Sequence, residues 1–479
     1  MTAISARLSA ERGPGIALAI VGLGLFGVVA GIGVAIGELD ALIASLTVLA
    51  CGAVLADYRI GAVLLIVMLP VQGSNLFPHS AFGIIGLNPL NMVLAVTLAS
   101  YLLRGHDLRR FMPKPLVWLF VVPIIIAGLI GMGHVRDIHP SFYDEELVHY
   151  SDTLGYLSDT LLKPMLKVLA AAMIGAAVAR SKKAESFLVP IIAAVWLMSL
   201  MAIGYVVVSG VSLGALALST SRAFFSGLGM HANDLGRLYA VAYSLLLFTW
   251  GETKDVRLKT VLVMTMGILT IALVLTFSRG AMVGWVLVNA LFLLWKFNAK
   301  TVGLGLLAAS AAMLVMPGAV IGRMSLGLVG GGDVDEFTAG RMTEIWIPLF
   351  PELFKSPIWG NGLDSIMWSR AIWTDQMLAV THPHNAYMQA ILDTGLVGLG
   401  LVLAFYWHVY RTARDLGSNA YLSPTMRGFY QGLVAGLLCF IITGFVGSSL
   451  RPLPEFAFLW IAIGMMYGQL ARRPGTGSN

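Results

Sequence analysis

Long apolar segments separated by short polar ones dominate the hydrophobic pattern of this chain. Many of them reach roughly 18 residues, the length with which a helix crosses about 30 Å of hydrocarbon. Because lipid offers no hydrogen bonds, the backbone of such segments must pair within helices. The pattern therefore predicts an all-α, polytopic bundle of about 14 transmembrane helices, built as a single integral membrane domain over residues 1–479. The expected spans are 15–36, 41–56, 60–72, 87–103, 115–133, 160–179, 186–207, 235–250, 260–277, 281–296, 301–322, 385–409, 427–447 and 456–471.

Composition and charge agree with a membrane protein. The chain is 58% hydrophobic and 12% charged, whereas soluble domains are closer to half apolar and a quarter charged. With the N-terminus inside, the inner segments hold most of the 31 basic residues and few of the 25 acidic ones. Positive charge on inner loops is the usual topology signal, so the net charge of +6 does not indicate a nucleic-acid partner. This assignment places both termini in the cytoplasm.

Three long outer segments collect the remaining polar residues: 134–159, 208–234 and 323–384. Loops longer than about 15 residues tend to be functional or disordered, and we expect 323–384 to be a periplasmic loop that carries short helices. The middles of the spans are nearly free of ionisable residues, whereas transporters usually bind their solutes near the midplane. The distribution favours an enzyme at the outer interface, with a solute transporter or a flippase component as the alternative from another class.

A histidine motif immediately precedes one of the predicted spans. His382 and His384 flank a proline, and Asn385 is a good N-cap for the helix that follows. Asn385, Gln389 and Asp393 recur every fourth residue, so one helix face is polar. Such a stripe usually faces the bundle interior or a water-filled cavity. A neutral histidine here is a candidate general base; the alternative is a histidine that only caps or packs.

Two arginines are candidate anion ligands, because guanidinium binds phosphate in a bidentate manner. Ser278-Arg279-Gly280 interrupts a long apolar run, and we expect a helical hairpin in which Gly280 adopts the positive φ of a tight reversal. Arg341 opens an amphipathic helix in the long loop. Each arginine has an alternative reading: Arg279 extends to lipid headgroups, and Arg341 pairs with Glu344.

The sequence indicates neither a metal nor a cofactor. The acidic run at 333–336 follows several glycines, as in a flexible solvated loop. The outer histidines lack metal-ligand spacing, and the chain contains no Walker loop, dinucleotide fingerprint or zinc pattern.

Several ordered motifs in residues 220–400 resemble the O-antigen ligase and Wzy-type polymerase superfamily. The histidine motif is the most specific of them, and Asp393-Thr-Gly395 stands where such proteins usually have Glu-x-Gly. The motifs that carry the resemblance are His231-Ala-Asn233, Ser278-Arg279-Gly280, Gly340-Arg341-xxx-Glu-Ile-Trp346, Pro357-Ile-Trp-Gly360-Asn-Gly362, His382-Pro-His384-Asn385-Ala-Tyr387-Met-Gln389 and Asp393-Thr-Gly395.

The resemblance implies a GT-C-like bundle in the bacterial inner membrane that transfers glycans from undecaprenyl pyrophosphate at the periplasmic face, without a metal or cofactor. The family's essential histidine falls on His384, and its pyrophosphate-binding arginines fall on Arg279 and Arg341, with Arg222 as a weaker candidate. Lys163 and Lys167 are candidate helpers. The residues expected to orient the acceptor or to support the site are His382, Asn385, Tyr387, Gln389 and Asp393.

The predicted function is that of an inverting, metal-independent glycosyltransferase. A polymerase of O-antigen or exopolysaccharide repeat units is preferred, because the number of predicted spans is high for a ligase. The alternatives are an O-antigen ligase that delivers glycan to lipid A core, and a protein-directed oligosaccharyltransferase. The expected partners are undecaprenyl-pyrophosphate-linked oligosaccharide, a lipid-linked repeat or lipid A core as acceptor, membrane lipids and a chain-length regulator.

Overall fold

The computed structural model describes residues 39–75, 77–81, 84–108, 110–148, 150–216, 219–296, 303, 318, 338 and 340–472. The expected span at 15–36 and the acidic run at 333–336 lie outside the described residues, as does the expected span at 301–322 except for residues 303 and 318.

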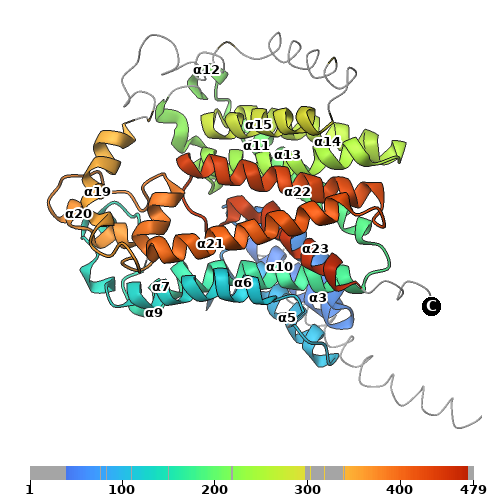
Figure 1. The fold of residues 1–479 in the computed structure, drawn as a ribbon, viewed down its shortest axis with the longest axis horizontal. Coiled ribbons are helices and arrows are strands. Elements are labelled where there is room, and N and C mark those ends of the chain that lie inside the picture. Colours follow the sequence, from blue (N-terminus) through green and yellow to red (C-terminus); the bar gives the residue numbers. More distant parts are fainter. Residues whose placement is uncertain are drawn as a thin grey trace, which may run out of the picture.

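Helices account for almost all of the described structure (Figure 1). The α-helices are α3 (Leu39–Ala56), α4 (Tyr58–Val71), α5 (Pro89–Leu103), α6 (Lys114–Leu116), α7 (Val122–Met132), α8 (Ser141–Asp144), α9 (Thr153–Tyr156), α10 (Lys163–Arg180), α11 (Leu188–Ser209), α12 (Leu213–Leu216), α13 (Ala232–Glu252), α14 (Val256–Leu275), α15 (Arg279–Trp295), α19 (Ile347–Leu353), α20 (Arg370–Trp373), α21 (Ala386–Ser418), α22 (Pro424–Thr443) and α23 (Ala457–Ala471).

Short 3₁₀ and π segments extend or connect these helices. They are η1 (Val117–Val121), η2 (Val135–Asp137), η3 (Leu157–Leu162), η4 (Ala184–Phe187), η5 (Ser219–Leu228), η6 (Met342–Trp346), η7 (Ser365–Trp368), η8 (Gly444–Val446) and η9 (Pro454–Phe456). One small antiparallel hairpin, β1 (Ser80–Ala81) and β2 (Ile84–Ile85), is the departure from an all-α chain within the described residues.

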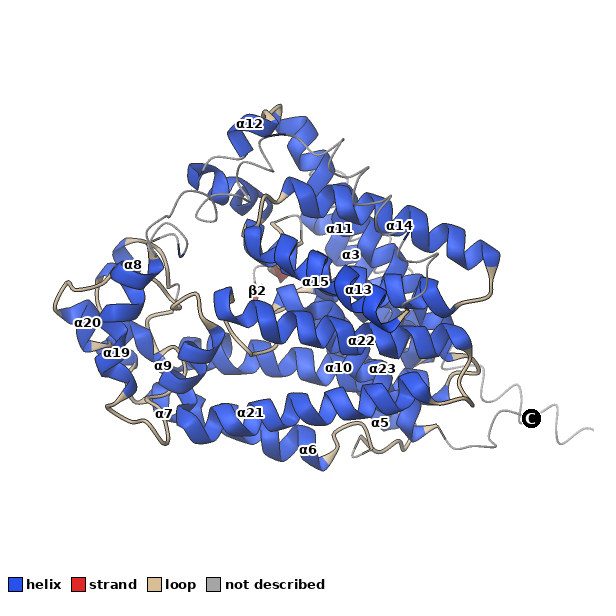
Figure 2. Ribbon diagram, turned by 45° about the horizontal axis from the view of Figure 1, so that its top comes forward, coloured by secondary structure: helices blue, strands red, loops and turns tan. Residues whose placement is uncertain are grey.

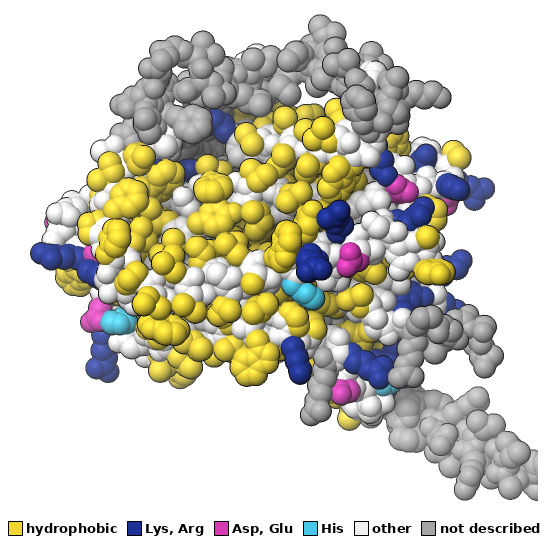
Figure 3. Space-filling model, viewed as in Figure 1, with side chains coloured by type: hydrophobic (Ala, Val, Ile, Leu, Met, Phe, Trp, Pro, Cys, Tyr) yellow, Lys and Arg dark blue, Asp and Glu magenta, His cyan; other side chains and the backbone are white. Residues whose placement is uncertain are grey.

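Six of the described helices are long and apolar enough to cross a membrane, and the chain is a polytopic membrane protein. They are Lys114–Met132, Thr153–Arg180, Ala184–Ser209, Val256–Leu275, Ala386–Ser418 and Pro424–Val446. Hydrophobic side chains cover the middle of the bundle surface, whereas charged side chains gather toward its two ends (Figure 3). This is the surface expected of a protein embedded in lipid. The total of about 14 spans stays a prediction.

Glycines allow the central helices to approach one another closely. A Cβ atom on Gly428 of α22 would lie 2.4 Å from the carbonyl oxygen of Phe248 in α13. One on Gly464 of α23 would lie 2.2 Å from the carbonyl oxygen of Ala171 in α10. Small residues at such crossings are typical of membrane helices, which associate through backbone packing and not through exclusion of water. The first contact sets the start of α22 beside the end of α13, and the second sets α23 beside α10.

The short helices of two long loops gather at one end of the bundle, which we call the loop end (Figures 1 and 2). Helices α8 and α9 belong to the first loop, and α19 and α20 belong to the second. The His139 backbone N–H donates to the carbonyl of Met367 at 3.1 Å and so joins the two loops. The sequence had assigned both loops to the same side of the membrane. Which side this is stays a prediction.

Candidate functional site

Helix α21 is broken near its start, and a loop segment repairs the break. Gly395 has φ 66° and ψ −176°, far from helical values. The break frees backbone carbonyls that need partners in a buried setting. The Asn361 N–H donates to the carbonyl of Leu392 at 2.8 Å, and the Gly362 N–H donates to that of Asp393 at 3.1 Å. The kink is therefore held by the loop that lies across it.

The Gly-Asn-Gly sequence in that loop is explained by close backbone contact. Gly360 and Gly395 both have positive φ, a conformation that glycine adopts without steric cost. A Cβ atom on Gly395 would lie 2.2 Å from the carbonyl oxygen of Ile358, and one on Gly360 would lie 2.4 Å from the Thr394 nitrogen. Two of the sequence motifs, residues 357–362 and 393–395, therefore contact each other at the kink, and we call this contact the joint.

A buried carboxylate completes the joint. Asp393 and Gln389 are each 2% exposed. Gln389 Nε2 donates to both carboxylate oxygens of Asp393 at 2.8 Å, and the Ser365 N–H and hydroxyl donate at 3.2 and 3.3 Å. We call Gln389, Asp393 and Ser365 the kink cluster. Their contacts are those of side chains that support the helix, and their oxygens and nitrogens are directed at one another.

The two histidines lie at the start of α21. Asn385 caps the helix by accepting from the N–H groups of Tyr387 and Met388 at 3.0 and 3.1 Å. The His382 and His384 rings are 4.3 Å apart in an edge-to-face arrangement. His384 has a φ of 53°, which is uncommon outside glycine and is often found at functional sites.

The histidine loop is anchored to the long loop that precedes it. The Trp346 indole N–H donates to the Pro383 carbonyl at 2.7 Å, and the Leu378 N–H donates to the Glu344 carbonyl at 3.2 Å. Segment 341–346 therefore packs beside the histidine loop, and Arg341 is the first residue of this segment.

Cations surround the histidine pair. Burial lowers the pKa of His384 to about 2, and the positive fields of His382 and Arg341 add to the effect. Burial also lowers the pKa of His382 to about 3, and the positive fields of Arg237 and His231 lower it further. Both imidazoles are consequently neutral at neutral pH. We call His382, His384, Arg237, Arg341 and Arg451 the histidine cluster.

Arg237, which the sequence analysis did not place in the site, is a buried member of this cluster. It lies in the second turn of α13, and its guanidinium donates to the Ser448 hydroxyl at 3.1 Å. Asp234 and Glu455 lie 3.5 and 3.7 Å from it. Burial raises the pKa of Glu455, and the neighbouring charge of Asp234 raises it further. Arg237 is therefore held rigidly.

Arg451 was missed in the same way. It forms an ion pair with Asp364 and donates to the Thr160 carbonyl at 3.3 Å, and its side chain is 15% exposed. Its field reaches His382. The approach of both arginines to the histidines depends on contacts between residues some 200 positions apart, such as Arg237 with Ser448, which local patterns do not reveal.

Arg279 begins α15 at the loop end, after the predicted hairpin. The Ser278 hydroxyl caps α15 and donates to Asn233 Oδ1 at 2.8 Å, so this turn lies beside the start of α13. The expectation that Gly280 takes a positive φ was wrong. Phe277 does so, with φ 48°, because Gly280 already belongs to the first turn of α15.

The other predicted residues are placed as follows. Arg222 lies in η5, and its side chain is outside the described part of the chain. The Tyr387 hydroxyl donates to the Ile441 carbonyl, and its ring lies 4.7 Å from that of Phe445, so it joins α21 to α22. Lys163 pairs with Asp159. Lys167 is 7% exposed.

Residues 264–403 match the family model Wzy_C, described as O-Antigen ligase. The resemblance noted in the sequence is thereby confirmed for this part of the chain. The matched range contains Arg279, Arg341 and the histidine motif, whereas Arg237 and Arg451 lie outside it. No curated protein matches the chain. This part of the chain is thus similar to the family described as O-Antigen ligase.

Proposed function

We propose that this protein is a periplasmic-face glycosyltransferase that moves glycan from undecaprenyl pyrophosphate to a sugar hydroxyl, as a polymerase of O-antigen or exopolysaccharide repeat units. The observation that carries the proposal is the histidine cluster, of which His382, His384 and Arg341 lie on the segment matched by the O-antigen ligase model. It combines a neutral imidazole with three guanidinium groups at the end of a membrane bundle. A base for a hydroxyl and cations for a diphosphate are the two needs of this reaction.

The leaving group explains the arginines. When the bond from the anomeric carbon to the phosphate oxygen breaks, its electrons stay on the lipid pyrophosphate and negative charge grows there. Fixed cations in a site shielded from water stabilise that charge. Arg341 is the best placed of the predicted arginines, since its field reaches both histidines. Arg237 and Arg451 add a positive background, and Arg279 stays a candidate ligand at the neighbouring hairpin.

The imidazole of His384 receives the proton. The acceptor oxygen forms the new bond to the anomeric carbon from the side opposite the pyrophosphate, which inverts the configuration. Its hydroxyl proton moves to the neutral ring of His384. A positioned base of this kind typically contributes about 10²–10⁴-fold. None of these steps requires a metal.

The bound donor tunes this base. With a pKa of about 2, His384 is too weak a base for efficient proton transfer at neutral pH. A pyrophosphate bound beside it brings negative charge, which favours the protonated imidazole and raises its pKa. Donor binding therefore strengthens this base. This protects the hydroxyl acceptor from activation before a donor is present.

The acceptor separates two candidate reactions. The description of the matched family as O-Antigen ligase favours transfer to lipid A core as the second candidate. Purified protein would be mixed with undecaprenyl-pyrophosphate-linked repeat units, with and without lipid A core, and with and without EDTA. A ladder of lipid-linked products without lipid A core is expected. A single core-linked product means a ligase, and the absence of transfer together with solute uptake into sealed vesicles would contradict both.

A further inference from the structure

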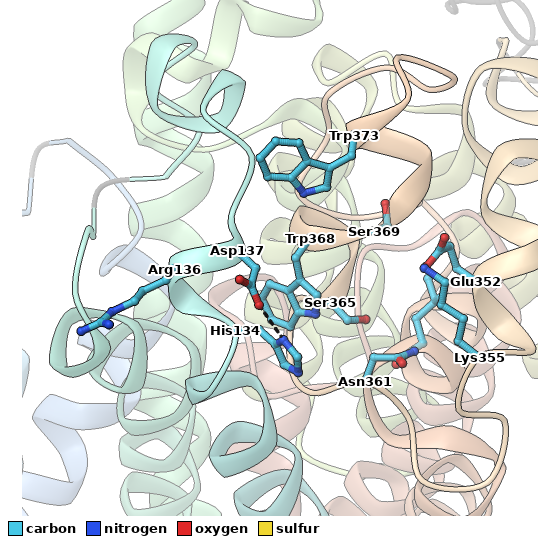
Figure 4. A pocket seen from close by; sticks show the side chains of 11 residues that line it. His134, Arg136, Asp137, Glu352, Lys355, Asn361, Ser365, Trp368, Ser369 and Trp373 are labelled. Carbon is cyan, nitrogen blue, oxygen red and sulfur yellow. Dashed lines mark hydrogen bonds and ion pairs between the residues drawn. The ribbon is translucent and has the colours of Figure 1, made fainter.

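A cavity of about 620 Å³ lies beside the kink cluster, and neither His382 nor His384 is among its lining residues (Figure 4). Ser365 and Leu392 form its floor on the side of α21. His134 and Asp137 contribute one wall from the loop after α7, and the segment from Glu352 to Trp373 contributes the other. It therefore opens between the two long loops that form the loop end of the bundle.

The lining combines flat aromatic surfaces with hydrogen-bonding groups. Trp368 and Trp373 lie on one side, and the Asn361 amide and the Asp137 and Glu352 carboxylates are directed around the same space (Figure 4). Ligand pockets pair an apolar lining with a few placed polar groups. Tryptophan supplies a large, rigid apolar face. A sugar ring has the matching surface, with C–H groups on its faces and hydroxyls around its edge.

Four of the five charged or titratable lining residues form two acid–base pairs, and the fifth is Arg136. His134 Nδ1 lies 3.0 Å from Asp137, and Lys355 Nζ lies 2.7 Å from Glu352. The Arg136 side chain points away from the other labelled residues (Figure 4). A phosphate or sulfate site would need unopposed cations or converging N–H groups. Paired acids and bases instead offer both acceptors and donors, which suits hydroxyl groups.

The aromatic wall is held in place by its neighbours. The Trp368 ring stacks on that of His134 at 5.4 Å, with 17° between the planes. The ring of His139 meets that of Trp373 edge to face at 4.6 Å. Trp373 is nevertheless 53% exposed, so one of its faces is open. The cavity is thus preorganised, which lowers the entropic cost of binding.

The cavity and the reaction site are joined through α21. Ser365 lines the cavity and also donates to Asp393. The helix from Ala386 to Leu392 spans about 9 Å at 1.5 Å per residue. We infer that this cavity binds a sugar of the glycan chain, one or more units away from the reacting bond, and holds that chain in register with His384. The inference rests on the proposed function, because it takes the glycan from that reaction.

The test uses Trp373→Ala, with Trp359→Ala as the matched control. Trp359 belongs to the same long loop and is 66% exposed, but it is not among the lining residues. The first measurement is transfer from native lipid-linked glycan by the purified full-length protein. Trp373→Ala should raise KM about three- to tenfold with kcat unchanged. Trp359→Ala should leave both values unchanged.

The second measurement does not need catalysis. The glycan is released from its lipid by mild acid, and its binding to the protein is followed by saturation-transfer NMR. His384→Asn protein should still bind it, and the double variant His384→Asn with Trp373→Ala should not. The inference is overturned if Trp373→Ala leaves binding and KM unchanged, if Trp359→Ala weakens both equally, or if sulfate displaces the glycan. Normal transfer by His384→Asn would instead contradict the proposed function and leave the binding result to decide on the cavity.

Discussion

The first turns of α21 connect two polar clusters that use their side chains differently. In the kink cluster, the carboxylate of Asp393 accepts from Gln389 and from Ser365, and all three residues are buried. In the histidine cluster, the rings of His382 and His384 lie against each other and among arginines, and positive charge surrounds a pair of neutral rings. In the first arrangement the donors converge on one carboxylate, although the buried Gln389 Oε1 has no hydrogen-bond partner among the described residues. In the second, two neutral rings lie in the field of several arginines.

The comparison distinguishes residues that support the helix from residues proposed to react, within the polar face at the start of α21. Asn385, Gln389 and Asp393 recur every fourth residue, yet Asn385 caps the helix and the other two close the kink. A stripe of polar residues in a membrane helix therefore does not by itself mark a reaction site. The distinguishing property is that the two histidine rings lie in the field of several cations.

The largest expected effect concerns His384. Its replacement by asparagine removes the base, and asparagine tolerates a positive φ, so the backbone at this position is preserved. We expect transfer to fall by about 10²–10⁴-fold with little change in the thermal midpoint of unfolding. Single-turnover transfer with purified lipid-linked donor measures the loss. His79→Asn, a change in an exposed histidine before β1, serves as the control and should retain activity; near-normal transfer by His384→Asn would remove the base from the account.

The next effect concerns the shape of the cation at residue 341. Arg341→Lys keeps the charge but loses the planar fork that binds two phosphate oxygens. The loss of one charge-assisted hydrogen bond should reduce kcat/KM roughly ten- to hundredfold. Steady-state kinetics with increasing donor measure this value. Lys259 of α14 lies over the Trp250 ring, and Lys259→Arg should be neutral; equal losses in the two variants would mean that Arg341 has no special role.

The kink cluster should respond in stability. Gly395→Ala puts a Cβ atom against the carbonyl of Ile358 at a position with positive φ, and such strain costs about 1–3 kcal/mol or more. Gly400→Ala, farther along α21, meets no atom within 4 Å and should be neutral or stabilising by about 0.5–1 kcal/mol. Thermal unfolding in detergent measures both. A normal midpoint for Gly395→Ala would show that the kink is not constrained.

The smallest effect is the pH dependence of the empty protein. Burial lowers the pKa values of His382 and His384 below the unfolded value of about 6.5. The unfolded chain therefore binds more protons below pH 6.5, and the free energy of unfolding decreases as the pH falls through that value. The expected loss is about 1 kcal/mol per histidine between pH 6.5 and 5.5. Thermal midpoints across this range measure the slope, which should flatten in a His382→Asn, His384→Asn double variant.

The pH dependence of activity should show that the bound donor raises the pKa of His384. Because bound pyrophosphate raises the pKa of His384, the acid limb of kcat should lie at higher pH than that of kcat/KM, which reports the free enzyme. Coincident limbs would show that the donor does not tune this base.

Much of the architecture could be predicted because it depends on local properties. Segment length and hydropathy indicated helices that cross a membrane, and the N-cap residue Asn385 marked a helix start correctly. The positive φ was assigned to Gly280 and not to Phe277, since sequence statistics favour glycine while packing against α13 decided the turn. Arg341 could be linked to His384 only through motif resemblance.

The rest depends on contacts between distant segments. The Gly360–Gly362 loop could be seen as a motif, but its hydrogen bonds to the kinked helix could not. Arg451 meets Asp364 only because the loop between α22 and α23 packs against the long loop. No periodicity in either segment specifies that meeting. The same holds for the cavity between the two long loops.

The central claim is that a lipid pyrophosphate binds between Arg341 and His384. Native mass spectrometry of the purified protein with undecaprenyl pyrophosphate tests it most directly, because it measures occupancy without catalysis. We predict that wild-type and His384→Asn proteins bind the lipid alike, while Arg341→Ala binds roughly ten- to hundredfold more weakly. Unchanged binding by Arg341→Ala would contradict the account.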